Sequence, residues 1–126
     1  MRMLVVLLGA SWLAGAPVKA TADEPVHCSI VSLIATPELF DGKRVIAEGI
    51  AVIGFEANAI YLSREAADHG SGVNAIGLDL PRDRDFAHLN LKWVLVEGTF
   101  RKDDHPGPNP RGYIVDIAHI FAIDAH

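Results

Sequence analysis

Two stretches of the chain carry one pattern, Lys43-Arg44-Val45-Ile46-Ala47-Glu48-Gly49 and Lys92-Trp93-Val94-Leu95-Val96-Glu97-Gly98. Both read Lys-x-Val-apolar-apolar-Glu-Gly, and they are offset by 49 residues. Their β-branched and apolar residues favour strands. A glycine inside a strand is typical of a bulge or a sharp bend, as at the corner of a barrel. Two strands that bend at the same point predict a sheet that curls into a small barrel.

Three further segments complete the predicted sheet. We place the two bent strands at 44–54 and 92–101, and the three other strands at 59–63, 73–80 and 113–123. Turn residues bound each of them. A helical turn is expected at 64–68 and a short helix or turn at 83–90, between the third and fourth strands. Five strands with a helical piece at that position are the plan of an OB-fold. The predicted fold class is therefore mainly β, with an OB-like barrel of five strands.

A short helix is expected before the first strand, at 29–40. Thr36-Pro37-Glu38 resembles a helix start, with a cap, a proline in the first turn and an acid after it. The side chains that would bury one face of this helix are Leu33, Ile34, Leu39 and Phe40. Asp41-Gly42 then turns the chain.

The first twenty residues read as a signal peptide. A basic start at Arg2 precedes an uncharged run at 4–16, and Val18-Lys19-Ala20 places small residues where a signal peptidase cleaves. We predict cleavage after Ala20, with Ala22 as the second choice. Thirteen residues rise only ~20 Å as a helix, short of the ~30 Å hydrocarbon core. We therefore expect no stable membrane anchor after cleavage and a periplasmic or secreted protein of the bacterial envelope.

The predicted mature chain has a flexible lead-in at 21–28 and one domain at 29–126. Loss of Arg2 and Lys19 leaves nine basic and sixteen acidic side chains, a net charge of −7. Nucleic acid binding depends on phosphate neutralisation by Lys and Arg, so we exclude nucleic acid as a partner. Cys28 is the only cysteine, and we expect it to pack as a small apolar side chain. A monomer or a weak oligomer is expected, without a cofactor.

Three runs resemble small exported bacterial proteins of OB-fold type: 40–49, which opens aromatic-Asp-Gly-Lys-x-Val-x-x-x-Gly, then 59–65 and 94–100. The likeness extends over about 30–123, nearly all of the mature chain. It implies the barrel and the export. That group has no established activity, so the resemblance implies no catalytic residue.

The candidate ligand site lies on the barrel face and in the 102–112 loop, because OB-folds commonly hold ligands at that end. Arg101, Lys102 and Arg111 flank this loop and would hold an acidic ligand or the carboxylates of a partner. Aromatic side chains would add a binding surface. The predicted ligand-binding residues are Tyr61, Trp93, Arg101, Lys102, His105, Arg111 and Tyr113.

Three functions remain open from the sequence. We favour a binding module without catalysis that recognises a small molecule, a peptide or an envelope partner. The first alternative is a metal-binding protein or hydrolase-type enzyme that uses Asp103, Asp104 and His105 with His119, although no spaced metal ligand is evident. The second is an assembly protein that pairs through an exposed strand edge. Outside the metal alternative, we expect His119 to be a hydrogen-bonded core histidine.

Overall fold

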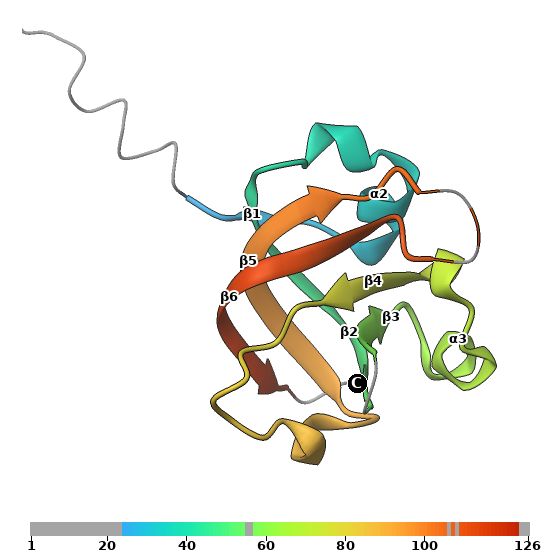
Figure 1. Cartoon of the computed structure of the whole chain (residues 1–126), viewed down its shortest axis with the longest axis vertical. Coiled ribbons are helices and arrows are strands. Elements are labelled where there is room, and N and C mark those ends of the chain that lie inside the picture. The colour runs from blue at the N-terminus through green and yellow to red at the C-terminus, as the bar shows by residue number, and fades with distance from the viewer. Residues whose placement is uncertain (1–23, 55–56, 106, 108, 124–126) are drawn as a thin grey trace, which may run out of the picture.

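The computed structural model describes residues 24–54, 57–105, 107 and 109–123. The predicted signal peptide and the start of the lead-in, residues 1–23, lie outside them. The predicted mainly β architecture is confirmed, as Figure 1 shows. The strands are β1 (Val26–His27), β2 (Arg44–Ile53), β3 (Asn58–Tyr61), β4 (Ala75–Leu78), β5 (Trp93–Lys102) and β6 (Gly112–Ala122). The helices are α2 (Ile30–Ala35) and α3 (Arg64–His69), with three 3-10 turns, η2 (Pro37–Leu39), η3 (Gly72–Asn74) and η4 (Ala87–Leu89).

The sheet closes on itself. Its strand order is β1-β2-β3-β4-β6-β5. An additional antiparallel pairing between β2 and β5 closes the strands β2 to β6 into a barrel. Within the barrel β4 and β6 run parallel, and every other neighbouring pair is antiparallel. The five strands β2 to β6 therefore form the predicted OB-like barrel, and β1 adds a short parallel extension on β2.

The first bent strand changes neighbours near Gly49. Residues Arg44 to Ile50 of β2 pair with β5, and Ile50 to Ile53 pair with β3. A Cβ on Gly49 would lie 2.5 Å from Cδ1 of Ile30 and 2.7 Å from the carbonyl oxygen of Tyr61. The glycine therefore lets α2 and the end of β3 approach the strand where it changes partners.

The ladder of the second bent strand, β5, is irregular at Gly98: three residues of β6, 116–118, stand opposite this one glycine, so the bulge lies in β6. The register between β5 and β6 shifts between Glu97 and Thr99, and Asp116 opposite has a φ of +50°. Arg44 holds this irregular point: its Nη1 donates to the carbonyl oxygen of Asp116 at 3.0 Å, and its Nη2 lies 3.3 Å from Oε2 of Glu97. The glycine signal from the sequence therefore marks a real bend in the ladder.

The barrel interior is filled by aliphatic side chains and one ring. The largest fully buried side chains are Phe100, Ile30, Leu33, Ile60, Ile76, Ile114, Val45, Val94 and Val96. Full burial of each such side chain stabilises the fold by about 1.5–3 kcal/mol relative to exposure. A second, smaller cluster lies outside the barrel and consists of Ile50, Tyr61, Ala67 and Ala75. Ala67 comes from α3, so α3 covers this outer cluster.

The helix expected at 29–40 is interrupted. Ser29 caps α2 by accepting the N–H of Ser32, and α2 ends at Ala35. Thr36 has φ −135° and ψ 61°, because the residue before a proline is disfavoured in the helical region. Pro37 therefore starts a separate 3-10 turn. The prediction that Leu39 is buried is wrong, since 59% of it is exposed.

Two other details differ from the sequence-based expectations. Val26 and His27, within the predicted flexible lead-in, pair with Val45 and Ile46 of β2. His119 is exposed, so its prediction as a core histidine is wrong. Phe121, on the same strand as His119, is also 46% exposed. No helix among the described residues is long and apolar enough to cross a membrane.

Candidate functional site

A hollow with a volume of about 670 Å³, which we call the main hollow, lies on the outer face of β3 and β4. Ile60 and Ile76 point into the barrel core, so their neighbours along the strands point outward. These outward neighbours are Ala59, Ala75 and Gly77, of which Ala59 and Ala75 line the hollow. The floor of the hollow includes these small residues, and larger apolar side chains add to the lining: Ile53, Leu78, Leu80 and Phe86.

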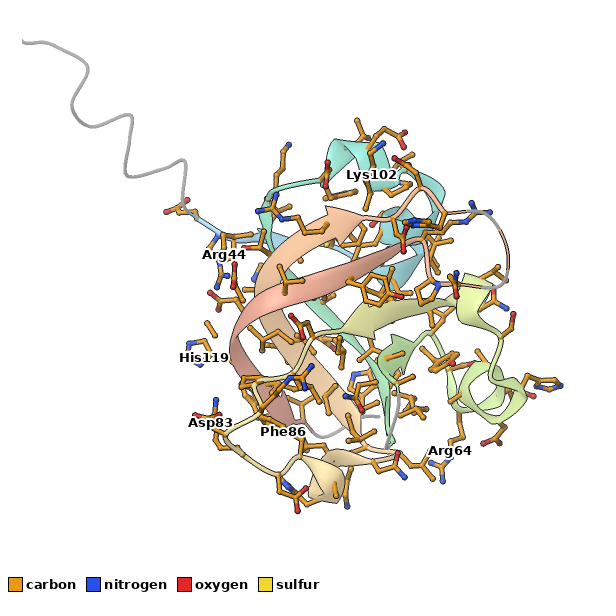
Figure 2. The ribbon with its side chains drawn as sticks, in the orientation of Figure 1. Arg44, Arg64, Asp83, Phe86, Lys102 and His119 are labelled. Atoms are coloured by element: carbon orange, nitrogen blue, oxygen red, sulfur yellow. The ribbon has the colours of Figure 1, made fainter. Side chains whose placement is uncertain are left out.

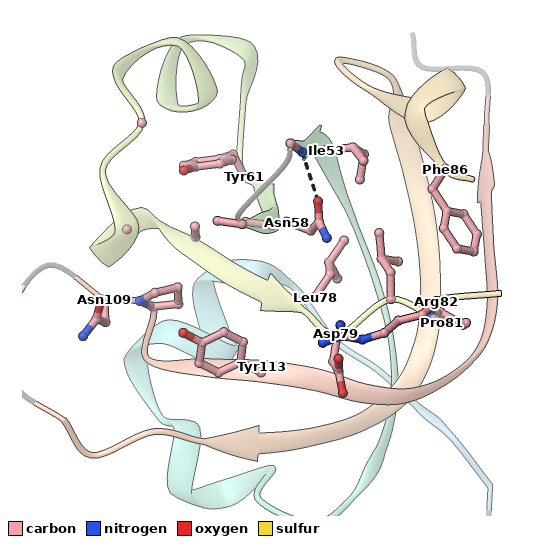
Figure 3. A pocket seen from close by; sticks show the side chains of 18 of the residues that line it. Ile53, Asn58, Tyr61, Leu78, Asp79, Pro81, Arg82, Phe86, Asn109 and Tyr113 are labelled. Carbon is pink, nitrogen blue, oxygen red and sulfur yellow. Dashed lines mark hydrogen bonds between the residues drawn. The ribbon is translucent and has the colours of Figure 1, made fainter. Parts of the chain in front are cut away.

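Two tyrosines flank this floor. Figure 3 shows Tyr61 and Tyr113 on either side of β4. Tyr61 is only 7% exposed and packs in the cluster beneath α3. Tyr113 belongs to β6 and pairs directly with Gly77. Of the predicted ligand-binding residues, these two are the ones that the structure brings to the main hollow.

Gly77 determines where the ring of Tyr113 lies. Three ring atoms, Cγ, Cδ2 and Cε2, lie within 3.0 Å of the point where a Cβ on Gly77 would be. Any other residue at position 77 would occupy the place of the ring. The bare backbone of β4 therefore lets Tyr113 pack against the sheet and form one wall of the hollow.

Polar side chains surround the rim. They are Asn58, Asp79, Arg82, Arg84, Asp85 and Asn109. The side chain of Asn58 holds the turn before β3, because its Oδ1 accepts a hydrogen bond from the N–H of Gly54 at 3.0 Å. Figure 3 shows the side chain of Arg82 extending toward Asp79. Two acids and two bases balance one another, so the rim carries no net charge.

A second hollow of about 410 Å³ adjoins the first on the other side of Tyr113. Leu78, Asp79 and Tyr113 line both hollows. The second hollow adds Arg101, Lys102, Asp103, His105 and Val115. Arg101 pairs with Tyr113 across the β5–β6 ladder. A ligand that crosses Tyr113 would therefore pass from the neutral face of β3 and β4 to the loop that follows β5.

The charged groups of this loop bind one another. Nδ1 and the backbone N–H of His105 both bond to Oδ1 of Asp103. The backbone bond from His105, followed by the side-chain bond, lowers the pKa of Asp103. The side-chain bond to Asp103 raises the pKa of His105. The ammonium of Lys102 lies 3.2 Å from Oδ1 of Asp104.

The predicted group of three cations does not converge. Nη1 of Arg101 lies 3.5 Å from the point where a Cβ on Gly42 would be, so the guanidinium extends over the turn before β2. Lys102 is engaged by Asp104, and Arg111 is exposed and lines none of the hollows described here. Of the three predicted cations, Arg101 and Lys102 therefore share the second hollow, and Arg111 does not join them.

The candidate metal ligands Asp103, Asp104, His105 and His119 do not form one cluster. In the described part of the chain, no three His, Cys, Asp or Glu side chains are placed to hold a metal ion. Asp103 bonds to His105, whereas Asp104 bonds to Lys102. His119 pairs with Glu97 in the β5–β6 ladder, and Figure 2 shows it far from Lys102, at the other end of these strands.

Trp93 belongs to a different hollow, of about 450 Å³, between the N-terminal segment and β2. Its Nε1 donates to Oε1 of Glu48 at 3.0 Å. Cys28 and Leu62 line the same hollow. Burial raises the pKa of the Cys28 thiol to about 11. Such a thiol is protonated at neutral pH and is a poor nucleophile. Because Trp93 lines this hollow and not the main hollow, it lies apart from Tyr61 and Tyr113.

Several residues of the main hollow and its floor were not predicted from the sequence, chiefly Gly77, Asn58, Asp79 and Arg82. The run Ala75-Ile76-Gly77-Leu78 does carry a signal, because its alternate positions are small and large. In a strand that closes a barrel, this alternation indicates a bare outer face.

No protein-family model matches the chain, and no curated protein matches it. Among solved structures, the chain is similar to a crystal structure assigned as an aspartyl-tRNA synthetase of Leishmania major Friedlin. The two are 14% identical, with a TM-score of 0.45, over 93% of this chain and 23% of that chain. The chain thus spans about a quarter of the length of the protein that it matches.

Proposed function

We propose that this protein is an exported binding module that holds a saccharide on the outer face of β3 and β4, without catalysing a reaction. The observation that carries the proposal is the wall formed by Tyr113, which packs over Gly77 beside a floor of small residues. The half-buried ring of Tyr113, beside small residues, offers a ring-shaped ligand a flat apolar surface to stack on.

The position of the hollow supports a saccharide. In OB-folds the second and third barrel strands, with the loops at that end, bind oligonucleotides or oligosaccharides. Here these strands are β3 and β4, and Asn109 and Pro110 come from the loop before the last strand. An oligonucleotide requires phosphate neutralisation. The rim is neutral and the predicted mature chain is strongly acidic, so an uncharged oligosaccharide fits this site better than an oligonucleotide.

The chemistry of the lining fits this class. Tyrosine combines an apolar ring with a hydroxyl group, so it contacts the apolar face of a sugar ring and also bonds to hydroxyl groups. Amide, carboxylate and guanidinium groups at the rim offer both donors and acceptors for the hydroxyl groups of the ligand. Sites that are specific for a small ligand combine an apolar lining with a few polar groups, as this hollow does.

Thermal unfolding of the purified protein with neutral cell-wall oligosaccharides tests the proposal. A ligand present at a hundred times its Kd raises the free energy of unfolding by about 2.7 kcal/mol. This raises the Tm of a domain of this size by roughly 10–20 °C. We expect Tyr113→Ala to remove the shift and Tyr113→Phe to retain most of it. Phe121→Ala, which removes an exposed ring of the same strand outside the hollow, is the matched control.

Two outcomes would contradict the proposal. One is an equal shift in wild type and Tyr113→Ala, because the ligand would then bind elsewhere. The other is hydrolysis of the oligosaccharide by the purified protein, detected by chromatography of the products. A parallel titration with single-stranded oligonucleotide should give no shift, since the rim lacks a surplus of cations.

A further inference from the structure

Among the described residues, one side of β6 has no neighbouring strand over most of its length. β5 pairs with β6 from Gly112 to Val115 and again from His119 to Ala122. On the other side β4 pairs only with Tyr113 and Ile114, and the N–H of Asp79 extends this contact by one bond to the oxygen of Ile114. Within the described residues, no strand pairs with that side of β6 beyond Ile114.

The unpaired side presents backbone hydrogen-bonding groups. The N–H of Ile123 donates to the oxygen of Trp93, so Ile123 faces β5. Because the direction alternates along an antiparallel strand, Ala122 and Ile120 on either side of Phe121 face away from β5. An edge with free N–H and C=O groups is a template for another strand.

The residues along this edge suit such a contact. The run Ile117-Ala118-His119-Ile120-Phe121-Ala122-Ile123 contains no Asp, Glu, Lys, Arg or proline. Ala118, His119 and Ala122 are exposed, and so is 46% of Phe121. Edge strands that avoid pairing usually carry charges or proline. In the sequence, Asp116 and Asp124 stand at the two ends of the run and limit its length.

The run is nearly the same in both directions. Read backwards from Ile123 it gives Ile-Ala-Phe-Ile-His-Ala-Ile, so only His119 and Phe121 exchange places about Ile120. Two identical strands in antiparallel pairing would place Ile120 opposite Ile120 of the second copy. Ile117 would then face Ile123, Ala118 would face Ala122, and His119 would face Phe121.

We infer that β6 pairs with β6 of a second copy of this chain, antiparallel and with the two-fold axis at Ile120. The backbone of Ile120 faces the open side, so the two copies would exchange both of its hydrogen bonds at the axis. The self-complementary run identifies the second copy, rather than an unrelated peptide, as the occupant. Because the contact is isologous, it closes at a dimer.

The experiment compares two double variants by light scattering, over a range of concentrations and with a reducing agent that excludes disulfides through Cys28. His119→Lys with Phe121→Glu places opposite charges across the axis, and we expect a dimer, as in wild type. His119→Lys with Phe121→Lys places like charges there, and we expect only monomer. Both positions are exposed, and circular dichroism verifies that both variants fold.

Leu39→Lys, a charge added at another exposed apolar side chain, should leave the dimer intact. A wild-type protein that stays monomeric at every concentration would overturn the inference. A dimer that persists in the variant with like charges would place the contact elsewhere. A dimer lost equally in both double variants would rule out the register centred on Ile120.

Discussion

The ring of Tyr113 occupies the space in which a side chain at position 77 would begin, with three of its atoms within 3.0 Å of that point. The two residues are neighbours in the parallel ladder between β4 and β6. This ladder includes only two residue pairs, so it is the shortest pairing in the barrel apart from β1. Packing of Tyr113 over Gly77 therefore both supports the weak pairing and shapes the main hollow.

The first prediction concerns Gly77→Ala. The added methyl group displaces the ring of Tyr113, so we expect the free energy of unfolding to fall by about 1–3 kcal/mol, as for overpacking of a core. Saccharide affinity should fall with it. Urea unfolding and ligand titration measure the two effects.

A double-mutant cycle with Tyr113→Ala gives the control for this prediction. Without the ring, the added methyl group at position 77 fits, so Gly77→Ala in the Tyr113→Ala background should have little effect on stability. An interaction energy of about 1 kcal/mol or more is expected for two residues in contact. Additive effects of the two changes would show that the ring does not depend on Gly77.

The second prediction concerns Leu91, which has a φ of +63° without being glycine. The left-handed conformation costs a residue with a side chain about 1–2 kcal/mol. Leu91→Gly removes this cost, whereas Leu39→Gly only adds flexibility to the unfolded chain, at about 0.5–1 kcal/mol. Both leucines are exposed, at 40% and 59%.

We therefore expect Leu91→Gly to be the more stable of the two variants by about 1 kcal/mol or more. Parallel denaturant unfolding of both proteins measures the difference. Equal losses in the two variants would mean that the conformation of Leu91 is not strained.

The barrel was predictable because its signals are local. The glycines at positions 49 and 98 each lie within a strand of β-branched residues, and both mark points where the ladder bends or changes partners. β1 was not predictable in this way, since two residues at Val26–His27 form a strand only because β2 lies beside them. The burial of His119 was wrongly predicted for a related reason: its apolar neighbours Ile117 and Ile120 pack against the core, whereas His119 itself is exposed.

The site was predictable only in part. Tyr61 and Tyr113 were identified as candidate aromatic residues, but nothing local connects them with Asn58 or Asp79. These residues meet because β4 and β6 pair in parallel, which is a property of the closed barrel. The charged loop shows the same limit: Lys102 and His105, predicted to bind a ligand, line the second hollow, but their ion pairs with Asp104 and Asp103 were not predicted.

The third prediction concerns the signal peptide, which lies outside the described residues. Expression in a bacterium with an intact secretion system should yield a protein that begins at Thr21, or at Asp23 if cleavage follows Ala22. Mass spectrometry of the intact protein distinguishes these products from the full chain. Ala20→Leu, which removes the small residue before the preferred cleavage site, should shift cleavage to Ala22 or prevent it. Recovery of the full chain from the cytoplasm would contradict the export.

The last prediction concerns the pair formed by Asp103 and His105. Their bond raises the pKa of His105, so its contribution to stability is fully present below the ordinary pKa of histidine and is lost as the pH rises through the raised value. The lowered pKa of Asp103 has the opposite consequence, because that contribution is lost as the pH falls through the lowered value. The pair is therefore strongest between the two folded pKa values.

NMR titration of the ring protons of His105 in wild type and in Asp103→Asn tests this relationship. Asparagine keeps the shape but removes the charge, so we expect the pKa of His105 to fall toward its ordinary value in the variant. Asp104→Asn is the matched control: Coulombic attraction to Asp104 is the smallest cause of the shift, so the pKa should fall much less. Equal shifts in the two variants would mean that general charge in the loop, rather than the bond to Asp103, sets the pKa of His105.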